Sequence, residues 1–105
     1  MYIRIVTFAL TGITPEQYEA QANAIADQFM HWPGLQWKIW LADRSRNTYG
    51  GIYLFDDKQH ADQSRHSALF VGLTSNTHFT DLTITEYDTL TTATALTTAL
   101  AAAAA

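Results

Sequence analysis

The middle of the chain holds two short apolar runs separated by a polar connection. The runs cover residues 35–41 (LQWKIWL) and 49–55 (YGGIYLF). Both are bounded by turn residues and rich in β-branched and aromatic side chains, which favours strands over helices. The connection at residues 42–48 has about the length of an antiparallel hairpin loop. The pattern predicts two paired strands, with a charged residue, Lys38, flanked by tryptophans inside the first.

A strand and a helix precede this hairpin. Residues 2–9 form a β-branched and aromatic run without a helical period, which predicts a strand. Thr14, Pro15 and Gln17 then supply the signals of a helix start: a capping side chain, a proline at the first helical position, and the second half of a capping box. An apolar stripe follows at spacings of three and four, until a proline–glycine pair ends the helix. The stripe consists of Tyr18, Ala22, Ile25, Phe29 and Trp32.

A second helical region and a last strand follow the hairpin. Asp56 and Asp57 place capping carboxylates at the start of the region. Residues 58–65 are polar and only weakly periodic, whereas residues 67–73 are apolar and anchor the region. The pattern then predicts a loop at residues 74–80 and a strand at residues 82–87.

The resulting order of elements is β-α-β-β-α-β. It predicts an α+β, ferredoxin-like fold, in which one four-stranded antiparallel sheet carries both helices on one face. The domain is expected to cover residues 1–90, followed by a low-complexity Thr/Ala tail at residues 91–105 whose alanine run is too short to hold a helix alone. The other face of the sheet also carries large residues, so we expect a homodimer that packs face to face and shares a barrel-like cavity.

Composition and charge narrow the classes of function. The 105 residues are 48% hydrophobic and 15% charged, which fits one globular domain with apolar surface hidden in a subunit interface. The net charge of −4 argues against nucleic acid and anionic membrane surfaces as partners, because both attract basic proteins. No stretch approaches the roughly 20 apolar residues of a membrane span. The absence of cysteine excludes disulfides and thiolate sites, and a cytoplasmic location is expected.

Motifs for metals, phosphates and dinucleotides are missing from the sequence. The four histidines, His31, His60, His66 and His78, show no spacing typical of a metal site. Ser67, next to one of them, is better explained as a helix cap than as a nucleophile. The glycine pair at positions 50 and 51 is too weak a signal for a phosphate loop. We therefore expect neither a metal nor a cofactor.

Alternation along the strands divides the side chains between the two faces of the sheet. The Ile and Leu set is expected under the helices: Ile3, Ile5, Leu35, Trp37, Ile39, Leu41, Ile52, Leu54, Leu82 and Ile84. The opposite face then presents aromatic side chains with a few polar groups among them, as in a pocket for a flat, partly polar molecule. Its expected members are Arg4, Phe8, Lys38, Trp40, Tyr53, Phe55, Thr85 and Tyr87.

Two alternatives to this pocket remain open. The same side chains could belong to a subunit interface, with Lys38 and Arg4 at its rim or paired across the dimer with Glu86 or an aspartate. In addition, a register slip of one residue would exchange the two sets of side chains between the faces.

The central hairpin also carries a family resemblance. Its strings GLQWKIWL and YGGIYLFDD are similar to the signature of the YdhR-like putative monooxygenases. The strings TPEQY at the first helix, PG before the hairpin, SALF in the second helical region and DLTITEYD near the end also match, so the resemblance covers about residues 1–90. It implies a dimeric α/β barrel related to the cofactor-independent antibiotic-biosynthesis monooxygenases, with a role in oxygenating aromatic compounds.

Three hypotheses of function follow. The first is a cofactor-free oxygenase of phenolic or quinol-like aromatics, in which Lys38 stabilises the substrate anion or acts as base while Trp40 and Tyr53 hydrogen-bond the substrate oxygens. The expected substrate-binding residues are Arg4, Phe8, Phe55, Thr85 and Tyr87. The second hypothesis is a non-catalytic binder of small aromatic molecules. The third is a dimerisation module whose cavity is only a core.

Overall fold

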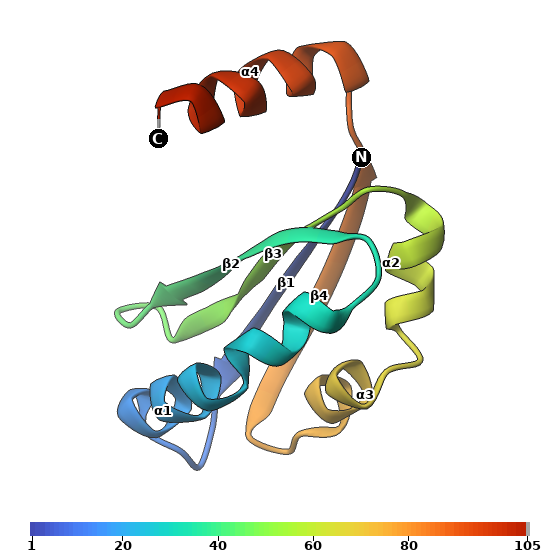
Figure 1. Ribbon diagram of the computed structural model, residues 1–105. Helices are drawn as coiled ribbons and strands as arrows, with labels where there is room; N and C mark the ends of the chain where they lie inside the picture. The colour runs from blue at the N-terminus through green and yellow to red at the C-terminus, as the bar shows by residue number, and fades with distance from the viewer. Residues whose placement is uncertain (105) are drawn as a thin grey trace.

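The computed structural model describes residues 1–104, and the side chains of residues 1–98 (Figure 1). Its strands are β1 (Tyr2–Leu10), β2 (Leu35–Asp43), β3 (Thr48–Phe55) and β4 (Phe79–Asp88). Its helices are α1 (Pro15–Ile25), the 3-10 helix η1 (Ala26–His31), α2 (Lys58–Ser64), α3 (Ala68–Ser75) and α4 (Thr91–Ala104). Among these helices none is long and apolar enough to cross a membrane.

The strands form one antiparallel sheet in the order β2-β3-β1-β4. The helices α1, η1, α2 and α3 all lie on one side of this sheet, as Figure 1 shows. The β2–β3 hairpin occupies one edge, and β1 lies between β3 and β4. The predicted α+β, ferredoxin-like fold is confirmed.

The predicted helix starts are also confirmed. The Thr14 hydroxyl accepts a hydrogen bond from the Gln17 backbone N–H at 3.1 Å, and the Gln17 side chain accepts one from the Thr14 N–H at 2.9 Å. The Asp57 carboxylate caps α2 by accepting from the His60 N–H, and the Ser67 hydroxyl caps α3. Each cap satisfies a backbone donor that the first helical turn leaves without a partner.

The first predicted helix changes type part-way. After Ile25 the α-helix tightens into the 3-10 helix η1, which has three residues per turn. Phe29 and Trp32, three residues apart, therefore lie on the same side, with ring centroids 5.0 Å apart and both rings buried. The 3-10 turn keeps the second half of the apolar stripe directed at the sheet.

The second helical region is two separate helices, α2 and α3. The predicted loop at residues 74–80 is shorter than expected, because α3 continues to Ser75 and β4 starts at Phe79. The tail contains the helix α4, which stands apart from the sheet in Figure 1. Near its base the Thr89 hydroxyl donates to the Met1 carbonyl at 2.8 Å. The last residue of the predicted tail, Ala105, lies outside the described residues, and the domain boundary at residue 90 stays a prediction.

The predicted assignment of the two sheet faces is wrong for three of the four strands. On β1 the residues under the helices are Tyr2, Arg4, Val6, Phe8 and Leu10, all buried. The register places Arg4 beside Tyr53 and Tyr53 beside Lys38, so these side chains share the helix-covered face. Ile3 and Ile5, expected under the helices, lie on the other face, which we call the open face.

The open face consists of Ile3, Ile5, Trp37, Ile39, Leu41, Ile52, Leu54, Thr83, Thr85 and Tyr87. Only on β4 is the predicted assignment right, since Leu82 and Ile84 pack against the core. Leu35 also stays on the helix side as predicted, because an irregularity in pairing between Leu35 and Trp37 shifts the alternation there. Both sets are apolar, so hydrophobicity alone could not decide which one the helices cover.

Candidate functional site

A cavity of about 260 Å³ lies between the sheet and the helical layer of this single chain. Its sheet wall contains Phe8, Lys38, Trp40, Gly50, Tyr53 and Phe79. Its helical wall contains Tyr18, Gln21, Ala22, Ile25, Phe29, Ala68, Leu69, Gly72 and Leu73, and Asn76 lies just beyond α3. The prediction of a cavity shared between subunits on the face away from the helices is therefore wrong for this aromatic set, because the cavity that these residues line lies under the helices of one chain.

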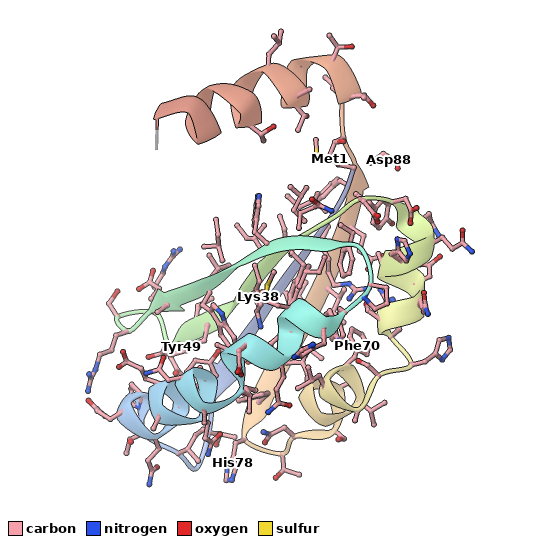
Figure 2. The ribbon with its side chains drawn as sticks, in the orientation of Figure 1. Met1, Lys38, Tyr49, Phe70, His78 and Asp88 are labelled. Carbon is pink, nitrogen blue, oxygen red and sulfur yellow. The ribbon has the colours of Figure 1, made fainter. Side chains whose placement is uncertain are left out.

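Lys38 is the only lysine or arginine among the described residues that line this cavity, where the side chains are otherwise aromatic, aliphatic or neutral polar. Figure 2 shows it between β2 and the helical layer. Its Nζ lies 3.3 Å from the ring centroid of Trp40, 3.6 Å from that of Phe29 and 4.6 Å from that of Tyr53. No hydrogen bond or ion pair joins Lys38 to another of the described side chains. The aromatic faces thus take the place that a carboxylate holds beside most buried lysines.

Burial lowers the pKa of Lys38 to about 7. The cause is desolvation, because the apolar walls replace the water that would stabilise the ammonium form. The ring faces attract the ammonium and act in the opposite direction. Near neutral pH this amine can therefore exchange a proton with a ligand, which a lysine in water does far less readily.

Two tyrosines supply hydroxyl groups to the same cavity. Desolvation raises the pKa of Tyr18 to about 12 and raises the pKa of Tyr53 still further. Both hydroxyls therefore stay protonated at neutral pH and can donate a hydrogen bond. Lys38, Tyr18 and Tyr53 are the titratable groups among the residues that line the cavity.

The structure brings together half of the predicted site residues. Lys38, Trp40, Tyr53 and Phe8 line one cavity, and their predicted roles stay predictions. Arg4 and Phe55 are fully buried on the same face but are not part of the cavity wall. Thr85 and Tyr87 lie on the open face, across the sheet from the cavity. They cannot contact the same ligand, because the sheet itself separates the two sets.

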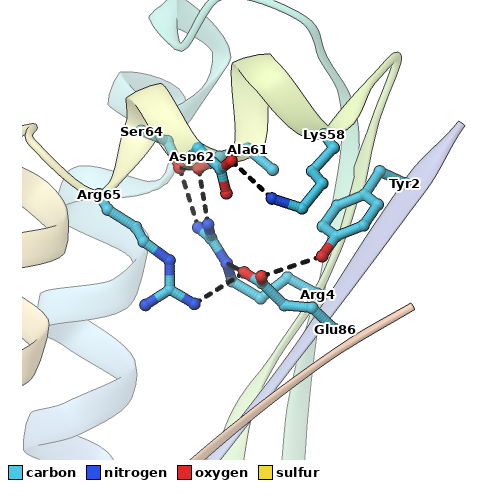
Figure 3. Close-up of polar contacts among 8 residues, drawn as sticks. All are labelled: Tyr2, Arg4, Lys58, Ala61, Asp62, Ser64, Arg65 and Glu86. Atoms are coloured by element: carbon cyan, nitrogen blue, oxygen red, sulfur yellow. Dashed lines mark hydrogen bonds and ion pairs between the residues drawn. The ribbon is translucent and has the colours of Figure 1, made fainter. Parts of the chain in front are cut away.

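Arg4 belongs to a polar cluster beneath α2 (Figure 3). Its Nε donates to Glu86 at 2.6 Å, and its terminal nitrogens donate to the Ser64 hydroxyl at 2.9 Å and the Ala61 carbonyl at 2.7 Å. Arg65 donates to the same Glu86 oxygen at 3.0 Å. Arg4 thus pairs with Glu86 within one chain and not across a dimer, and the guanidinium is committed to protein groups.

Glu86 is held ionised by this cluster. Burial acts to raise the pKa of its carboxyl, but the hydrogen bonds and positive charges of Arg4 and Arg65 outweigh burial, and the pKa lies below its ordinary value. The Arg4 guanidinium also lies over the rings of Phe55 and Phe70, about 5 Å from each centroid. The cluster fastens α2 and the start of α3 to the sheet and so supports the cavity from behind.

Sequence reasoning missed the polar residues that the helices contribute. Gln21 lines the cavity from α1, and Asn76 lines it just after α3. Gln21 lies three residues after Tyr18 and four before Ile25, so it belongs to the same helical face as the apolar stripe. A polar residue within such a stripe is the signal that could have identified it. Asn76 follows a helix end and offers no comparable signal.

A second grouping of titratable residues lies at the start of α2. Ligand-type atoms of Asp56, Asp57 and His60 lie within 4.8 Å of one another, and all three side chains are at least partly exposed. His60 Nδ1 is 2.6 Å from an Asp56 oxygen, and this hydrogen bond raises the pKa of His60. Sequence reasoning compared the histidines only with one another and therefore did not find the grouping. Helix capping by Asp57 and the His60–Asp56 hydrogen bond account for the contacts.

Comparison with models of known protein families identifies the family of this chain. The model of the family described as "Putative mono-oxygenase ydhR" matches residues 3–100. The chain belongs to this family. The match extends through the domain and into α4, and the resemblance predicted from the hairpin strings is confirmed. No sequence among the curated proteins matches the chain.

Solved structures similar to this ydhR-family member share its fold at low sequence identity. A mutant of SnoaB, described as a cofactor-independent oxygenase from Streptomyces nogalater, has a TM-score of 0.68 at 18% identity over 85% of this chain and 92% of that chain. A "putative antibiotic biosynthesis monooxygenase" from Deinococcus radiodurans has a TM-score of 0.70 at 16% identity, again over 85% of this chain and 92% of that chain. A mutant of MhuD with two manganese protoporphyrin IX molecules per active site has a TM-score of 0.68 at 10% identity, over 86% of this chain and 95% of that chain. At these identities the similarity shows the fold alone.

Proposed function

We propose that this ydhR-family protein is a cofactor-independent monooxygenase of small phenolic or quinol-like aromatics. The observation that carries the proposal is Lys38, a cavity lysine that has aromatic rings as neighbours and no carboxylate partner among the described residues. Such a site suits a flat ligand that brings its own negative charge. The similarity in fold to SnoaB, described as a cofactor-independent oxygenase, supports the reaction type.

The proposed reaction begins when the phenol or enol loses a proton inside the cavity. Lys38 accepts this proton as the neutral amine, and the ammonium so formed pairs with the substrate anion. The anion then transfers an electron to O₂, and the two radicals combine to form a C–O bond and a hydroperoxide. Cleavage of the O–O bond leaves one oxygen in the product as a carbonyl and releases the other as water. The substrate supplies all the electrons, so the reaction needs no external reductant.

The remaining cavity residues position the substrate. Tyr53 keeps its proton and donates a hydrogen bond to a substrate oxygen, and the Trp40 indole N–H does the same. Phe8 stacks on the ring of the substrate. For Arg4 and Phe55 we propose a supporting role behind the cavity wall, and for Thr85 and Tyr87 a place in the subunit interface.

This function predicts lysine-dependent oxygen consumption. Metal-free protein should consume O₂ with at least one member of a panel of hydroquinones and anthrones, and Lys38→Met should lower kcat/KM at least about 100-fold, as removal of a general base does. Lys58→Met is the matched control: this exposed lysine pairs with Asp62 at 2.8 Å and should be replaceable without effect. An oxygen electrode and product analysis provide the measurement.

The result also separates the alternative functions. Saturable quenching of tryptophan fluorescence by the same aromatics, without O₂ consumption, would contradict the oxygenase and favour a non-catalytic binder. Neither binding nor turnover, together with a more stable Lys38→Met protein, would favour a dimerisation module, because an unpaired lysine costs stability in a core that has no ligand.

We further propose a homodimer formed through the open face. Ile39 on this face is 51% exposed and Tyr87 is 53% exposed, while the helices cover only the opposite side of the sheet. A second copy would bury this apolar surface. The absence of cysteine suits a reducing compartment, and we propose the cytoplasm as its location.

Ile39→Glu should shift the dimer to monomer, because the interface would have to bury an unpaired carboxylate. Val71→Glu is the control, since Val71 is equally apolar and 53% exposed but lies on α3, on the other side of the molecule. Light scattering after size-exclusion chromatography measures both masses. A monomeric wild-type protein, or equal effects of the two substitutions, would contradict the proposed interface.

A further inference from the structure

We propose that Lys38 captures aromatic aldehydes as a covalent imine inside the cavity. This carbonyl-binding activity is separate from oxygenation and needs no O₂. It uses the same cavity but does not depend on the proposed oxygenase reaction. Three observations support it: the isolation of the Lys38 amine, the composition of the surrounding walls and the space around the side chain.

The chain provides an internal comparison, because it contains two lysines, Lys38 and Lys58. Lys58 is exposed, and its Nζ donates to Asp62 at 2.8 Å. This pairing holds Lys58 as an ammonium ion, which has no lone pair to attack a carbonyl. Lys38 has no such contact with the described residues, and its Nζ lies against the rings of Trp40 and Phe29. The two amines therefore differ in both charge partner and surroundings.

Desolvation by the cavity walls favours a neutral, reactive amine and outweighs the attraction of the ring faces for the ammonium form. Among the described residues that line the cavity there is no carboxylate, so none of them stabilises the ammonium form through an ion pair. The other titratable groups that line the cavity with Lys38 are Tyr18 from α1 and Tyr53 from β3, and both remain uncharged at neutral pH. A desolvated lysine in an apolar pocket is the usual setting of imine-forming lysines.

Gly51 leaves the space that the Lys38 side chain occupies. A Cβ added to Gly51 would lie 2.8 Å from Lys38 Cε, closer than atoms of this kind approach. The missing side chain on β3 therefore leaves room for the lysine to reach the cavity. The cavity volume of about 260 Å³ accommodates a molecule with one aromatic ring, and the ring faces around Nζ suit a flat carbonyl compound.

The covalent step balances without an oxidant or reductant. The Nζ lone pair attacks the carbonyl carbon, and one proton moves from nitrogen to the former carbonyl oxygen, which gives a carbinolamine. A proton from solvent then protonates the hydroxyl, the nitrogen lone pair expels it as water, and the resulting iminium returns its one extra proton to solvent. The net reaction joins one aldehyde and one amine to give one imine and one water. Because the step is reversible, a reducing agent is needed to trap the product.

Reductive trapping tests the proposal on the full chain. Wild-type protein is incubated without O₂ at neutral pH with benzaldehyde and sodium cyanoborohydride, and peptide mapping locates the added benzyl groups. We expect Lys38 to be modified at least about tenfold faster than Lys58, because a much larger share of its amine is neutral. Equal or slower modification of Lys38 relative to Lys58 would overturn the proposal, whatever happens at the Met1 amino group.

Two variants make the assignment specific. Lys38→Arg keeps a long basic side chain but cannot form an imine, so the fast modification should disappear, whereas Lys58→Arg should leave it unchanged. Persistent fast modification elsewhere in the Lys38→Arg protein would also overturn the proposal. If Lys38→Arg fails to fold, the rate ratio within the wild-type chain remains decisive. Failure of the oxygenase alone would leave this anaerobic modification intact, so the two proposals fail separately.

Discussion

Replacing Gly50 with alanine is expected to destabilise the protein by about 3–5 kcal/mol, the range of the most severe single substitutions. Gly50 has a φ of 151°, which side chains of L-residues rarely adopt. An added Cβ would lie 1.8 Å from the Val6 carbonyl oxygen and 2.7 Å from its carbon. Gly50 pairs with Thr7 across the two central strands, so relief of this contact would separate β3 from β1. Urea unfolding monitored by tryptophan fluorescence measures the loss.

Gly72→Ala is the matched control for this substitution. Gly72 lies in α3, and an added Cβ would meet no atom within 4 Å. Alanine is the better helix former, so this variant should be stabilised by about 0.5–1 kcal/mol. A similar loss of stability in both variants would show that the close approach at Gly50 is not the cause.

Removal of the Glu86 carboxylate is the second substitution with a large expected effect. Glu86→Ala should cost about 3 kcal/mol of unfolding free energy, the lower end of the range for breaking a buried ion pair. Arg4 is fully buried and would lose its charge partner at 2.6 Å, although Ser64 and the Ala61 carbonyl would still accept its hydrogen bonds. The exposed pair of Lys58 and Asp62 supplies the control, and Asp62→Asn should change stability little.

The same carboxylate should make stability depend on pH in the acid range. Because the pKa of Glu86 is lower in the folded protein than its ordinary value of about 4.5, its contribution is complete above that value. The contribution is lost as the pH falls through the lower, folded pKa. Glu86→Gln should therefore flatten the difference in stability between about pH 5 and pH 3. An unchanged slope would show that other carboxyl groups control acid unfolding.

The boundaries and types of most elements could be predicted because their signals are local. The capping box at Thr14, the caps at Asp57 and Ser67, and the alternation along β1 each depend on residues within a few positions of one another. The 3-10 helix η1 was missed, because its tight turns depend on the packing of Phe29 and Trp32 against the sheet and not on a local sequence signal. Gln21 and Asn76 were missed because their importance depends on a cavity that forms between distant segments.

Within a single strand, the sequence by itself determined which side chains share a face. Arg4, Phe8, Lys38, Trp40 and Tyr53 were predicted to lie together, and they do, because a strand alternates with a period of two and the antiparallel register carries this alternation from strand to strand. Alternation does not say which of the two faces the helices cover. Both candidate sets are apolar, so the choice depends on how long-range contacts close the fold.

Only the tertiary structure made that choice. The aromatic set, together with Arg4 and Lys38, lies beneath the helices, where Glu86 neutralises the arginine and ring faces surround the lysine. The Ile and Leu set is left on the open face. The cavity therefore belongs to a single chain, and Thr85 and Tyr87 lie across the sheet from it. Local patterning fixed which side chains of one strand share a face, whereas the pairing of β4 with β1 and the docking of α1, η1 and α3 decided which of these sets lie together and which face became the cavity.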